Sequence, residues 1–413
     1  MIRASAALTL TVSLAACGGN PSPAPPRPVP TRPDTVAPAA PNRAIVPTPP
    51  PPPPPRAPVR LAFTGDINLG TLTLPGGVPP DSGRGLLDAA ASALRGDLVV
   101  GNFEGVLGDS GTTYKCSAEG RRVTPADTIP APPDTLPRRK PRGRRGARPE
   151  PPRMCYAFLT PPWLAPRLRE AGFTHLNLAN NHASDFGPGA RDSSAELLHM
   201  LGLRTYGPLD RIAIDTVRRG DSVTTVALVG FTTYPFAYDL LDIPRSVAVV
   251  DSVRRLVDLL VVTFHGGAEG TRALHVPMVA ESLGQEPRGE LRRWARAVVD
   301  AGADAVVGHG PHVLRGIELY RGRPIAYSLG NFLTYRGFNL AGPLGVTGVL
   351  QLELAPGSGL RRARLVPMRQ EPGSGPAPDP GGAALDLVRQ LSSEDFPGSG
   401  VRVTEDGALL PLE

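Results

Sequence analysis

Cysteine is scarce in this sequence, with 3 residues among 413, and aromatic residues make up only 5% of the chain. No CxxC spacing occurs, which argues against a zinc site built from cysteines. No basic stripe is interleaved with aromatic residues, so a nucleic-acid partner is not expected. The apolar stretch near the N-terminus, residues 6–16, is too short to span a bilayer.

That stretch has the form of a secretory signal. It follows Arg3 and ends in the small residues Ala15 and Ala16, as cleaved export signals do. Because Cys17 comes next, the segment resembles a bacterial lipobox, in which the cysteine is lipidated and becomes the new N-terminus. We therefore predict a signal peptide over 1–17 and a membrane-anchored lipoprotein of the cell envelope, periplasmic or on the cell surface. An ordinary cleaved signal with an incidental cysteine is the alternative.

Proline dominates the next segment, with 18 prolines among residues 18–58, including the unbroken run 49–55. Such a segment cannot bury a core and stays extended as polyproline II. We predict a disordered tether over 18–58.

The other two cysteines, Cys116 and Cys155, flank a basic interval. Residues 138–153 hold eight basic residues and one acidic residue, and we predict a disordered insertion over about 117–154. In an exported chain the two cysteines favour a disulfide that closes the base of this insertion; two free thiols in a reducing compartment are the alternative.

The same interval accounts for the positive charge of the chain. It contributes about seven net positive charges by that count, whereas the whole chain carries +6. The remaining body is therefore close to neutral. The insertion either contacts an anionic cell-surface polymer or lipid headgroups, or is simply solvated.

From residue 59 onward, apolar patterns predict alternating strands and helices. Expected strands are 59–64, 97–104, 174–179, 224–231, 258–264, 303–307 and 323–329, with edge-like antiparallel strands at 314–320 and 346–354. Expected helices are 83–94, 162–171, 189–201, 247–257 and 288–301. This order predicts an α/β fold of mixed sheets flanked by helices. A body over 59–370 is followed by a loose tail, 371–413, with a short helix at 383–391.

Polar side chains gather at the ends of the predicted strands, where open α/β sheets place their chemistry. These residues are Asp66, Glu104, Asn181, His182, Asp185, His265, Glu269, His309 and His312. Carboxylate, carboxamide and imidazole donors suit divalent Mn, Fe or Zn. One or two such ions would activate water and hold a phosphate-like oxygen, so the pattern favours a hydrolase.

The motifs that carry these residues resemble those of the CapA family. They are Gly-Asp-Ile-Asn-Leu-Gly from residue 65, Gly-Asn-Phe-Glu from 101, Ala-Asn-Asn-His-Ala-Ser-Asp-Phe-Gly from 179, Phe-His-Gly-Gly-Ala-Glu from 264, Gly-His-Gly-Pro-His-Val-Leu-Arg-Gly-Ile-Glu from 308, and Ile-Ala-Tyr-Ser-Leu-Gly-Asn-Phe from 325. The family is linked to poly-γ-glutamate capsule synthesis, and its fold is similar to calcineurin-like metallophosphoesterases. The resemblance covers about 59–370.

The resemblance implies roles for these residues. The implied metal ligands are Asp66, Glu104, Asn181, His265, His309 and His312. It implies that His182 is the acid-base residue and that Asp185 orients it. Glu269 either orients His265 or caps a helix.

The sequence also departs from the calcineurin-like pattern. Ile67 and Asn68 follow Asp66 where an Asp-x-His ligand pair is usual, so one imidazole is missing. Glu104 replaces a bridging aspartate, and the gap between His309 and His312 is longer. The number of metal ions therefore stays open.

Three functions follow. The leading hypothesis is a metal-dependent hydrolase or transferase of capsule or cell-envelope polymer metabolism, whose partners are an anionic polymer or a phosphate-like substrate and the capsule synthesis machinery. The second is a non-enzymatic accessory protein that anchors or exports an anionic polymer. The third keeps the fold without a metal and uses the imidazoles and carboxylates for proton transfer.

Overall fold

The computed structural model describes residues 56–115, 117, 119–128 and 156–412. The predicted signal peptide and lipidation site Cys17, nearly all of the proline-rich tether, Cys116, Cys155 and the basic run 138–153 lie outside the described residues. No helix in the described part of the chain is both long and apolar enough to cross a membrane.

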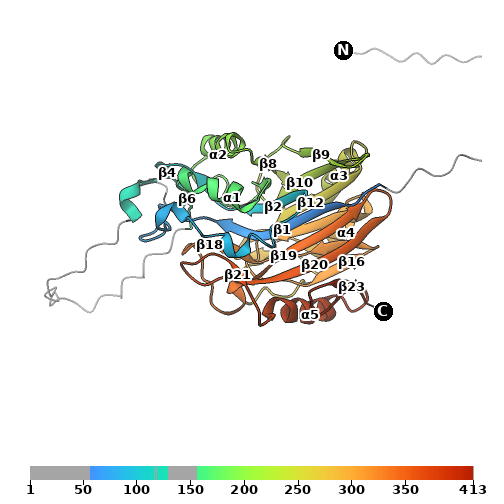
Figure 1. Ribbon diagram of the computed structural model, residues 1–413. Coiled ribbons are helices and arrows are strands. Elements are labelled where there is room, and N and C mark those ends of the chain that lie inside the picture. The colour runs from blue at the N-terminus through green and yellow to red at the C-terminus, as the bar shows by residue number, and fades with distance from the viewer. Residues whose placement is uncertain (1–55, 116, 118, 129–155, 413) are drawn as a thin grey trace, which may run out of the picture. The chain divides into compact units, whose positions relative to one another are not determined.

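Two mixed β-sheets form the centre of the fold (Figure 1). Sheet 1 has the order β21 (Ala377–Pro378), β20 (Gly359–Arg369), β19 (Val346–Ala355), β1 (Val59–Asn68), β2 (Leu98–Phe103), β7 (His175–Asn177) and β8 (Arg204–Tyr206), with β18 (Asn331–Thr334) paired to β1. Sheet 2 has the order β11 (Tyr238–Asp239), β10 (Ser222–Thr232), β12 (Leu259–His265), β15 (Ala305–His309), β17 (Arg323–Ala326) and β16 (Ile317–Tyr320), with β9 (Ala213–Arg219) paired to β10.

Four small ribbons and the helices complete the fold. The ribbons pair β3 (Val106–Leu107) with β6 (Leu159–Thr160), β4 (Gly111–Thr113) with β5 (Arg121–Val123), β13 (Glu281–Leu283) with β14 (Glu286–Gly289), and β22 (Val401–Val403) with β23 (Leu409–Pro411). The α-helices are α1 (Pro166–Ala171), α2 (Pro188–Met200), α3 (Ile243–Arg254), α4 (Leu291–Asp300) and α5 (Ala383–Asp395). Short 3₁₀ turns occur at Asp81–Gly83, Asp88–Ala90, Pro125–Thr128, Pro162–Leu164 and Gly342–Gly345.

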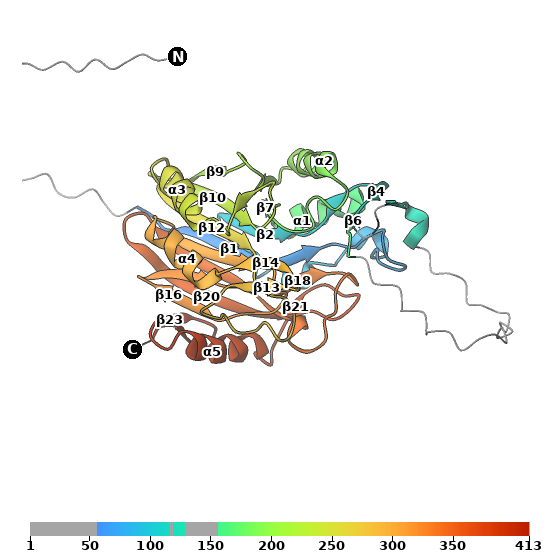
Figure 2. The same cartoon turned by 180° about the vertical axis from the view of Figure 1, so that it is seen from behind.

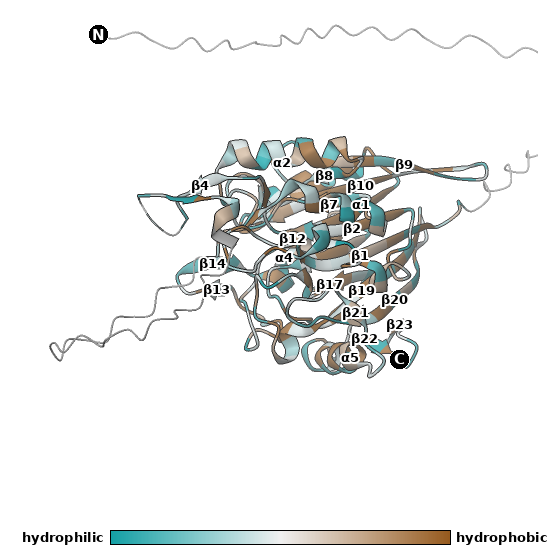
Figure 3. Cartoon of the chain, turned by 60° about the vertical axis from the view of Figure 1, so that its left-hand side comes forward, coloured by the Kyte–Doolittle hydropathy of each residue, from teal (hydrophilic) through white to brown (hydrophobic). Residues whose placement is uncertain are grey.

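Three apolar cores follow from the alternation of side chains along the strands. The first lies between the sheets and includes Leu61 and Val100 of sheet 1 and Leu228 and Val261 of sheet 2. The second lies on the outer face of sheet 1 against α1 and α2, and the third on the outer face of sheet 2 against α3 and α4 (Figure 2). Hydrophobic colour accordingly concentrates on the strands, while α2 shows hydrophilic segments (Figure 3). The predicted sandwich of mixed sheets flanked by helices is confirmed.

The predicted helix over 83–94 is wrong. Only two 3₁₀ turns form there, because Ser82, Gly83 and Gly85 adopt positive φ values of 54°, 68° and 74°, which an α-helix does not accommodate. Leu87 and Leu94 are nevertheless buried in the second core. The apolar spacing therefore located the buried face but not the backbone conformation.

The C-terminal segment contains the short helix predicted at 383–391, which forms within α5, but the segment is packed rather than loose. Helix α5 buries Leu385 and Val388 in the first core, and Val401 and Leu409 from the β22–β23 ribbon join them. The segment thus closes one edge of the space between the sheets. Its proline- and glycine-rich start hid this role, because residues 371–382 are largely irregular and partly exposed.

Candidate metal centre

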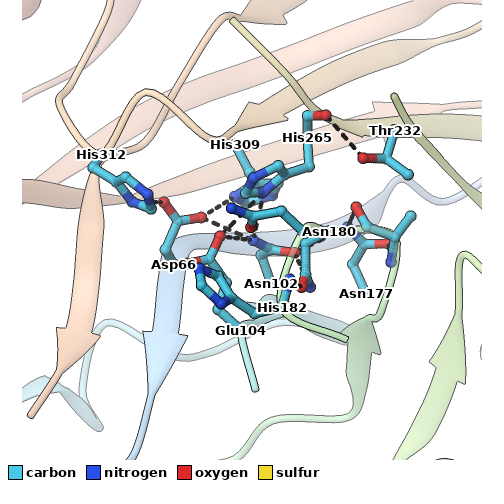
Figure 4. Close-up of polar contacts among 12 residues, drawn as sticks. Asp66, Asn102, Glu104, Asn177, Asn180, His182, Thr232, His265, His309 and His312 are labelled. Carbon is cyan, nitrogen blue, oxygen red and sulfur yellow. Dashed lines mark hydrogen bonds and ion pairs between the residues drawn. The ribbon is translucent and has the colours of Figure 1, made fainter. Parts of the chain in front are cut away.

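Parallel pairing brings the polar strand ends together in two layers. In sheet 1, Asp66 of β1 lies opposite Asn102 of β2, two residues before Glu104. In sheet 2, His265 at the end of β12 lies opposite His309 at the end of β15. The carboxyl ends of these strands meet, so one layer supplies carboxylates and the other supplies imidazoles (Figure 4).

A glycine contact fixes the start of the site. A Cβ atom at Gly65 would lie 1.9 Å from the carbonyl oxygen of Gly330, so no larger residue fits. The same carbonyl accepts the backbone N–H of Asp66 at 2.9 Å. The strand register of β1 shifts between Phe63 and Asp66, and such an irregularity can redirect a side chain beside a functional site.

The two carboxylates lie among the three imidazoles. His309 Nδ1 is 3.3 Å from Asp66 Oδ1, and His312 Nδ1 is 2.9 Å from Asp66 Oδ2. On the other side, His265 Nδ1 is 3.1 Å from Glu104 Oε1. Ligand atoms of Asp66, Glu104 and His312 all lie within 4.8 Å of one another.

Several buried atoms of this cluster have no hydrogen-bond partner among the described residues. They are Asp66 Oδ2, Glu104 Oε2, Asn181 Oδ1, His265 Nε2, His309 Nδ1, His312 Nδ1 and Asn331 Oδ1. Asp66 Oδ2 and His312 Nδ1 are close, but not in hydrogen-bond geometry. Buried polar atoms without partners are costly, and a cation coordinated by these oxygens and nitrogens would satisfy them. The donor set therefore fits a divalent ion of the Mn, Fe or Zn type.

Burial and mutual charge separate the pKa values of these groups. Burial raises the pKa of Asp66, but His309 and His312 outweigh it and hold that pKa below its usual range. Burial and the charge of Asp66 raise the pKa of Glu104 well above normal. Burial lowers the pKa of His312, but Glu104 and Asp66 raise it to about 10 overall. Burial and the Arg288 cation hold the pKa of His265 well below normal.

His312 also has an unusual backbone. Its φ is 60°, a left-handed conformation that is sparsely populated for residues other than glycine. Asn331 holds it there by donating its side-chain N–H to the carbonyl oxygen of His312 at 3.1 Å. Strain of this kind gathers at functional sites, and here it turns the imidazole toward Asp66.

The second half of the site follows β7. Asp185 Oδ2 lies 2.8 Å from His182 Nδ1 and also accepts the backbone N–H of Phe158 at 2.8 Å. The structure thus places Asp185 where the resemblance puts an orienting carboxylate. Burial lowers the pKa of His182; Asp185 opposes this effect, and Lys115 adds to it. The imidazole is therefore favoured in its neutral form.

Lys115 is a site residue that sequence reasoning missed. Its Nζ donates to Asp185 Oδ1 at 2.6 Å and to the Asn181 carbonyl at 3.0 Å, and lies 3.1 Å from His182 Nδ1. It stands outside the strand-end motifs, beside the basic insertion, so no local pattern marked it.

Asn102 was also missed, although it stands inside the Gly-Asn-Phe-Glu motif. Its Nδ2 donates to Asp66 Oδ1 at 2.9 Å and to Glu104 Oε1 at 3.1 Å, and its Oδ1 accepts N–H groups of Asn177 and Asn180 at 3.1 and 3.2 Å. It joins both carboxylates to the loop after β7. Its position could have identified it in the sequence, because Asn102 stands two residues before Glu104 and residues two apart on a strand point to the same face.

The two asparagines of the Asn-Asn-His motif play different parts. Asn180 is fully used, since its Nδ2 also donates to the Phe103 carbonyl at 2.8 Å and its Oδ1 accepts the His182 N–H at 3.0 Å. Asn181 instead keeps Oδ1 without a partner. Only Asn181 therefore has a free ligand atom, which agrees with the role implied by the motif.

Glu269 does not occupy either predicted position. Its Oε1 accepts from Arg288 at 2.9 Å, and its Oε2 lies 4.0 Å from His312 Nε2 rather than beside His265. It caps no helix either, because α4 begins after Glu290. The buried guanidinium of Arg288 attracts this carboxylate, and a sequence pattern cannot reveal such a distant partner.

A pocket of about 400 Å³ opens beside the cluster. Its walls include His182, His312 and Asn181 from the site and Lys115 at the rim. Rings of Tyr156, Tyr234 and Phe338 also line it. A ligand in this pocket would contact the imidazole of His182 and the unpartnered oxygen of Asn181 together.

This fold and site define a two-sheet α/β sandwich with a buried carboxylate and imidazole cluster at the strand ends. Residues 144–336 match the family model described as "Bacterial capsule synthesis protein PGA_cap". The chain is 32% identical over 188 residues to the PGA biosynthesis protein CapA of Bacillus subtilis, covering 41% of this chain and 45% of that protein. It is 30% identical over 255 residues to the capsule biosynthesis protein CapA of Bacillus anthracis, covering 56% of each.

Over these stretches the chain is similar to the CapA family, which is the family that its motifs resemble. It spans about half the length of these relatives. The part that matches the family model includes Asn181, His182, His265 and His309, whereas Asp66 and Glu104 precede it. Among solved structures, a putative 5′-nucleotidase from Staphylococcus aureus is similar with a TM-score of 0.39 and 13% identity, covering 82% of this chain and 59% of that one.

Proposed function

We propose that this protein is a metal-dependent hydrolase or transferase of the CapA family. Its substrate is a capsule or cell-envelope polymer such as poly-γ-glutamate, and the protein is exported and anchored to a membrane. The observation that carries the proposal is the group of buried, unpartnered ligand atoms on Asp66, Glu104, His265, His309 and His312. A fold without a ligand at this position would leave each of these atoms at an energetic cost.

The protein's own residues divide the work. Asp66, Glu104, Asn181 and the three imidazoles would hold one or two ions, and Asn102 fixes the two carboxylates against each other. A bound divalent ion supplies Lewis-acid activation of water and of an ester or amide oxygen.

His182 moves the proton. Asp185 holds the His182 ring through Nδ1, and the ring lines the pocket. A neutral imidazole fixed in this way can accept or donate a proton at the reacting group.

Metal content and turnover test this proposal. Purified wild-type protein and His265→Ala should differ in bound Mn, Fe or Zn by elemental analysis, whereas His199→Ala, an exposed position on α2, should retain the wild-type content. His182→Gln should keep the metal and lose hydrolysis of bis-(p-nitrophenyl) phosphate or poly-γ-glutamate by about 10²- to 10⁴-fold, the usual contribution of a general acid or base. A folded wild-type protein that takes up no metal would refute the proposal.

Membrane anchoring is tested separately. Cys17→Ala should move the protein from the membrane fraction to the soluble fraction of cells, because it removes the residue that would carry the lipid. Unchanged fractionation would contradict a lipid anchor at this residue.

A second candidate function is that of an accessory protein that holds an anionic polymer without cleaving it. The eight basic residues between Arg138 and Arg153 favour it. Deleting 138–153 should then abolish retention of poly-γ-glutamate on cells while leaving metal content unchanged. Retention at the wild-type level would exclude this role for the insertion.

A further inference from the structure

A second cleft lies away from the metal centre, at the opposite end of β1. It has a volume of about 360 Å³. Four arginines line it, together with a glutamine and a glutamate: Arg60, Arg95, Arg362, Arg364, Gln351 and Glu353.

Strand register explains why these residues share a face. Arg60 of β1 pairs with Glu353 of β19, and Glu353 pairs with Arg362 of β20. In the next row Gln351 pairs with Arg364. Their strand neighbours Leu61, Leu352 and Ala363 point into the core between the sheets, so the arginines project from the outer face of sheet 1.

The charges in this cleft do not balance. Arg60 Nε lies 3.4 Å from Glu353 Oε1, and Arg364 Nε donates to the backbone oxygen of Asp406 at 2.9 Å. Within the described chain, no carboxylate lies at ion-pair distance from Arg95 or Arg362. Arg95 and Arg362 therefore carry positive charges that no described carboxylate neutralises. A ligand with negative groups would supply these missing partners.

We propose that this arginine cleft binds a linear polyanion whose repeating groups are carboxylates. Guanidinium groups bind carboxylates through two parallel hydrogen bonds, and several arginines in one cleft suit several carboxylates along one chain. Nucleic acid is a poorer match, because no aromatic side chain lines the cleft to stack on a base. The choice of carboxylates as the repeating groups rests on the polymer-related function proposed above, whereas the anion-binding cleft itself does not.

The cleft is distinct from the metal centre. Arg60 and Asp66 stand six positions apart on β1, which corresponds to roughly 20 Å along a strand. A polymer chain of modest length could therefore contact both places, with the cleft holding one part while another part reaches the pocket.

Charge reversal in the full-length protein tests this inference. The affinity for fluorescent poly-γ-glutamate is measured for wild type and for Arg95→Glu/Arg362→Glu. The double variant should bind about tenfold more weakly, because each exposed ion pair contributes up to about fivefold to affinity. Glu353→Gln should change affinity in the opposite direction, because it removes the carboxylate that lines the cleft. Both effects should shrink as salt is added.

The matched control is Arg255→Glu/Arg293→Glu. These side chains, at the C-cap of α3 and on α4, are 64% and 72% exposed. They lie outside the cleft, and the net charge changes by the same amount. All variants are compared again in a background in which the arginines of 138–153 are replaced by glutamine, so that the insertion cannot mask the cleft. If reversal impairs folding, Arg95→Gln/Arg362→Gln replaces it, with an expected loss of a few fold.

The outcomes separate the two proposals. Unchanged binding by the cleft variants, or an equal loss in the control pair, overturns the cleft. Tighter binding of polyphosphate or of single-stranded DNA than of poly-γ-glutamate overturns the carboxylate assignment. If the wild-type protein takes up no metal and the cleft variants bind polymer more weakly than wild type does, the metal-dependent enzyme is refuted and the cleft is supported.

Discussion

Replacing Arg315 by methionine should lower the free energy of unfolding by about 3 to 5 kcal/mol, the cost of removing one partner from a buried ion pair. Arg315 lies three residues after His312, and its side chain is 0% exposed, while that of its partner Glu281 is 4% exposed. The guanidinium donates to both Glu281 oxygens, at 3.0 and 2.7 Å, and to the Ala273 carbonyl at 2.7 Å.

The magnitude follows from what the variant leaves behind. Glu281 would remain buried with only the Ala268 N–H, 2.9 Å away, as a donor, and the Ala273 carbonyl would lose a charged donor. Each hydrogen bond to a charged group contributes about 1.5 to 3 kcal/mol, and the two Glu281 contacts are not independent. A total near 4 kcal/mol is therefore expected.

Urea unfolding, followed by the fluorescence of the buried Trp294, measures this change. Arg255→Met is the matched control, since its exposed i,i+4 pair with Asp251 should contribute less than about 0.5 kcal/mol. The double variant Arg315→Met/Glu281→Met should recover most of the loss, because two apolar side chains leave no buried charge.

A loss below about 1 kcal/mol for Arg315→Met would refute this reasoning. It would mean that the pair behaves like a solvated surface pair. Hydrogen exchange gives a second readout, because the pair anchors residues 268–281 and their amides should exchange faster in the single variant.

Three further predictions concern single positions. Gly65→Ala should destabilise the fold by at least about 1 to 3 kcal/mol, since its Cβ would meet the Gly330 oxygen at 1.9 Å; an unchanged midpoint in urea would contradict this packing. Lys115→Met should lower the free energy of unfolding by about 1 to 3 kcal/mol, because the buried carboxylate of Asp185 loses its cation. Lys115→Arg should restore most of this stability. Equal unfolding free energies of wild type and both variants would argue against the ion pair between Lys115 and Asp185. Burial raises the pKa of Asp215, but the hydrogen bond and charge of His175 outweigh it and hold the pKa below its usual value of 3.8. The ionised Asp215 should therefore stabilise the fold fully above the pKa of the unfolded state, and this stabilisation should disappear as the pH falls through the pKa of the folded state. A difference in unfolding free energy between wild type and Asp215→Asn that stays constant down to pH 2 would contradict this prediction.

The fold was largely predictable because buried strands and amphipathic helices leave clear periodic signals. In α4 the buried residues Leu291, Trp294, Ala295, Val298 and Val299 follow helical spacing, and the predicted helix 288–301 contains it. The 83–94 segment shows the limit of this signal. Its apolar spacing is also helical, but positive φ angles at its start are a backbone property that periodicity does not reveal.

The candidate site was predictable where its residues stand in motifs at strand ends. Asp66, Glu104 and His312 are separated by up to 246 positions (312 − 66), yet the rule that chemistry gathers at the carboxyl ends of strands brought them together. Contacts between side chains from unrelated elements could not be foreseen. Lys115 reaches the site from the loop that follows β4. Glu269 pairs with a guanidinium 19 residues away.

The division of the site between two layers has a consequence for how variants should be interpreted. Asp66 and Glu104 lie in or directly after strands of sheet 1, and His265, His309 and His312 lie in or shortly after strands of sheet 2. The first core packs between the two sheets and keeps them in alignment. A substitution at a core residue such as Val261, which contacts no ligand, can therefore shear one half of the site past the other. Loss of metal in such a variant would report slippage between layers and would not identify a missing ligand.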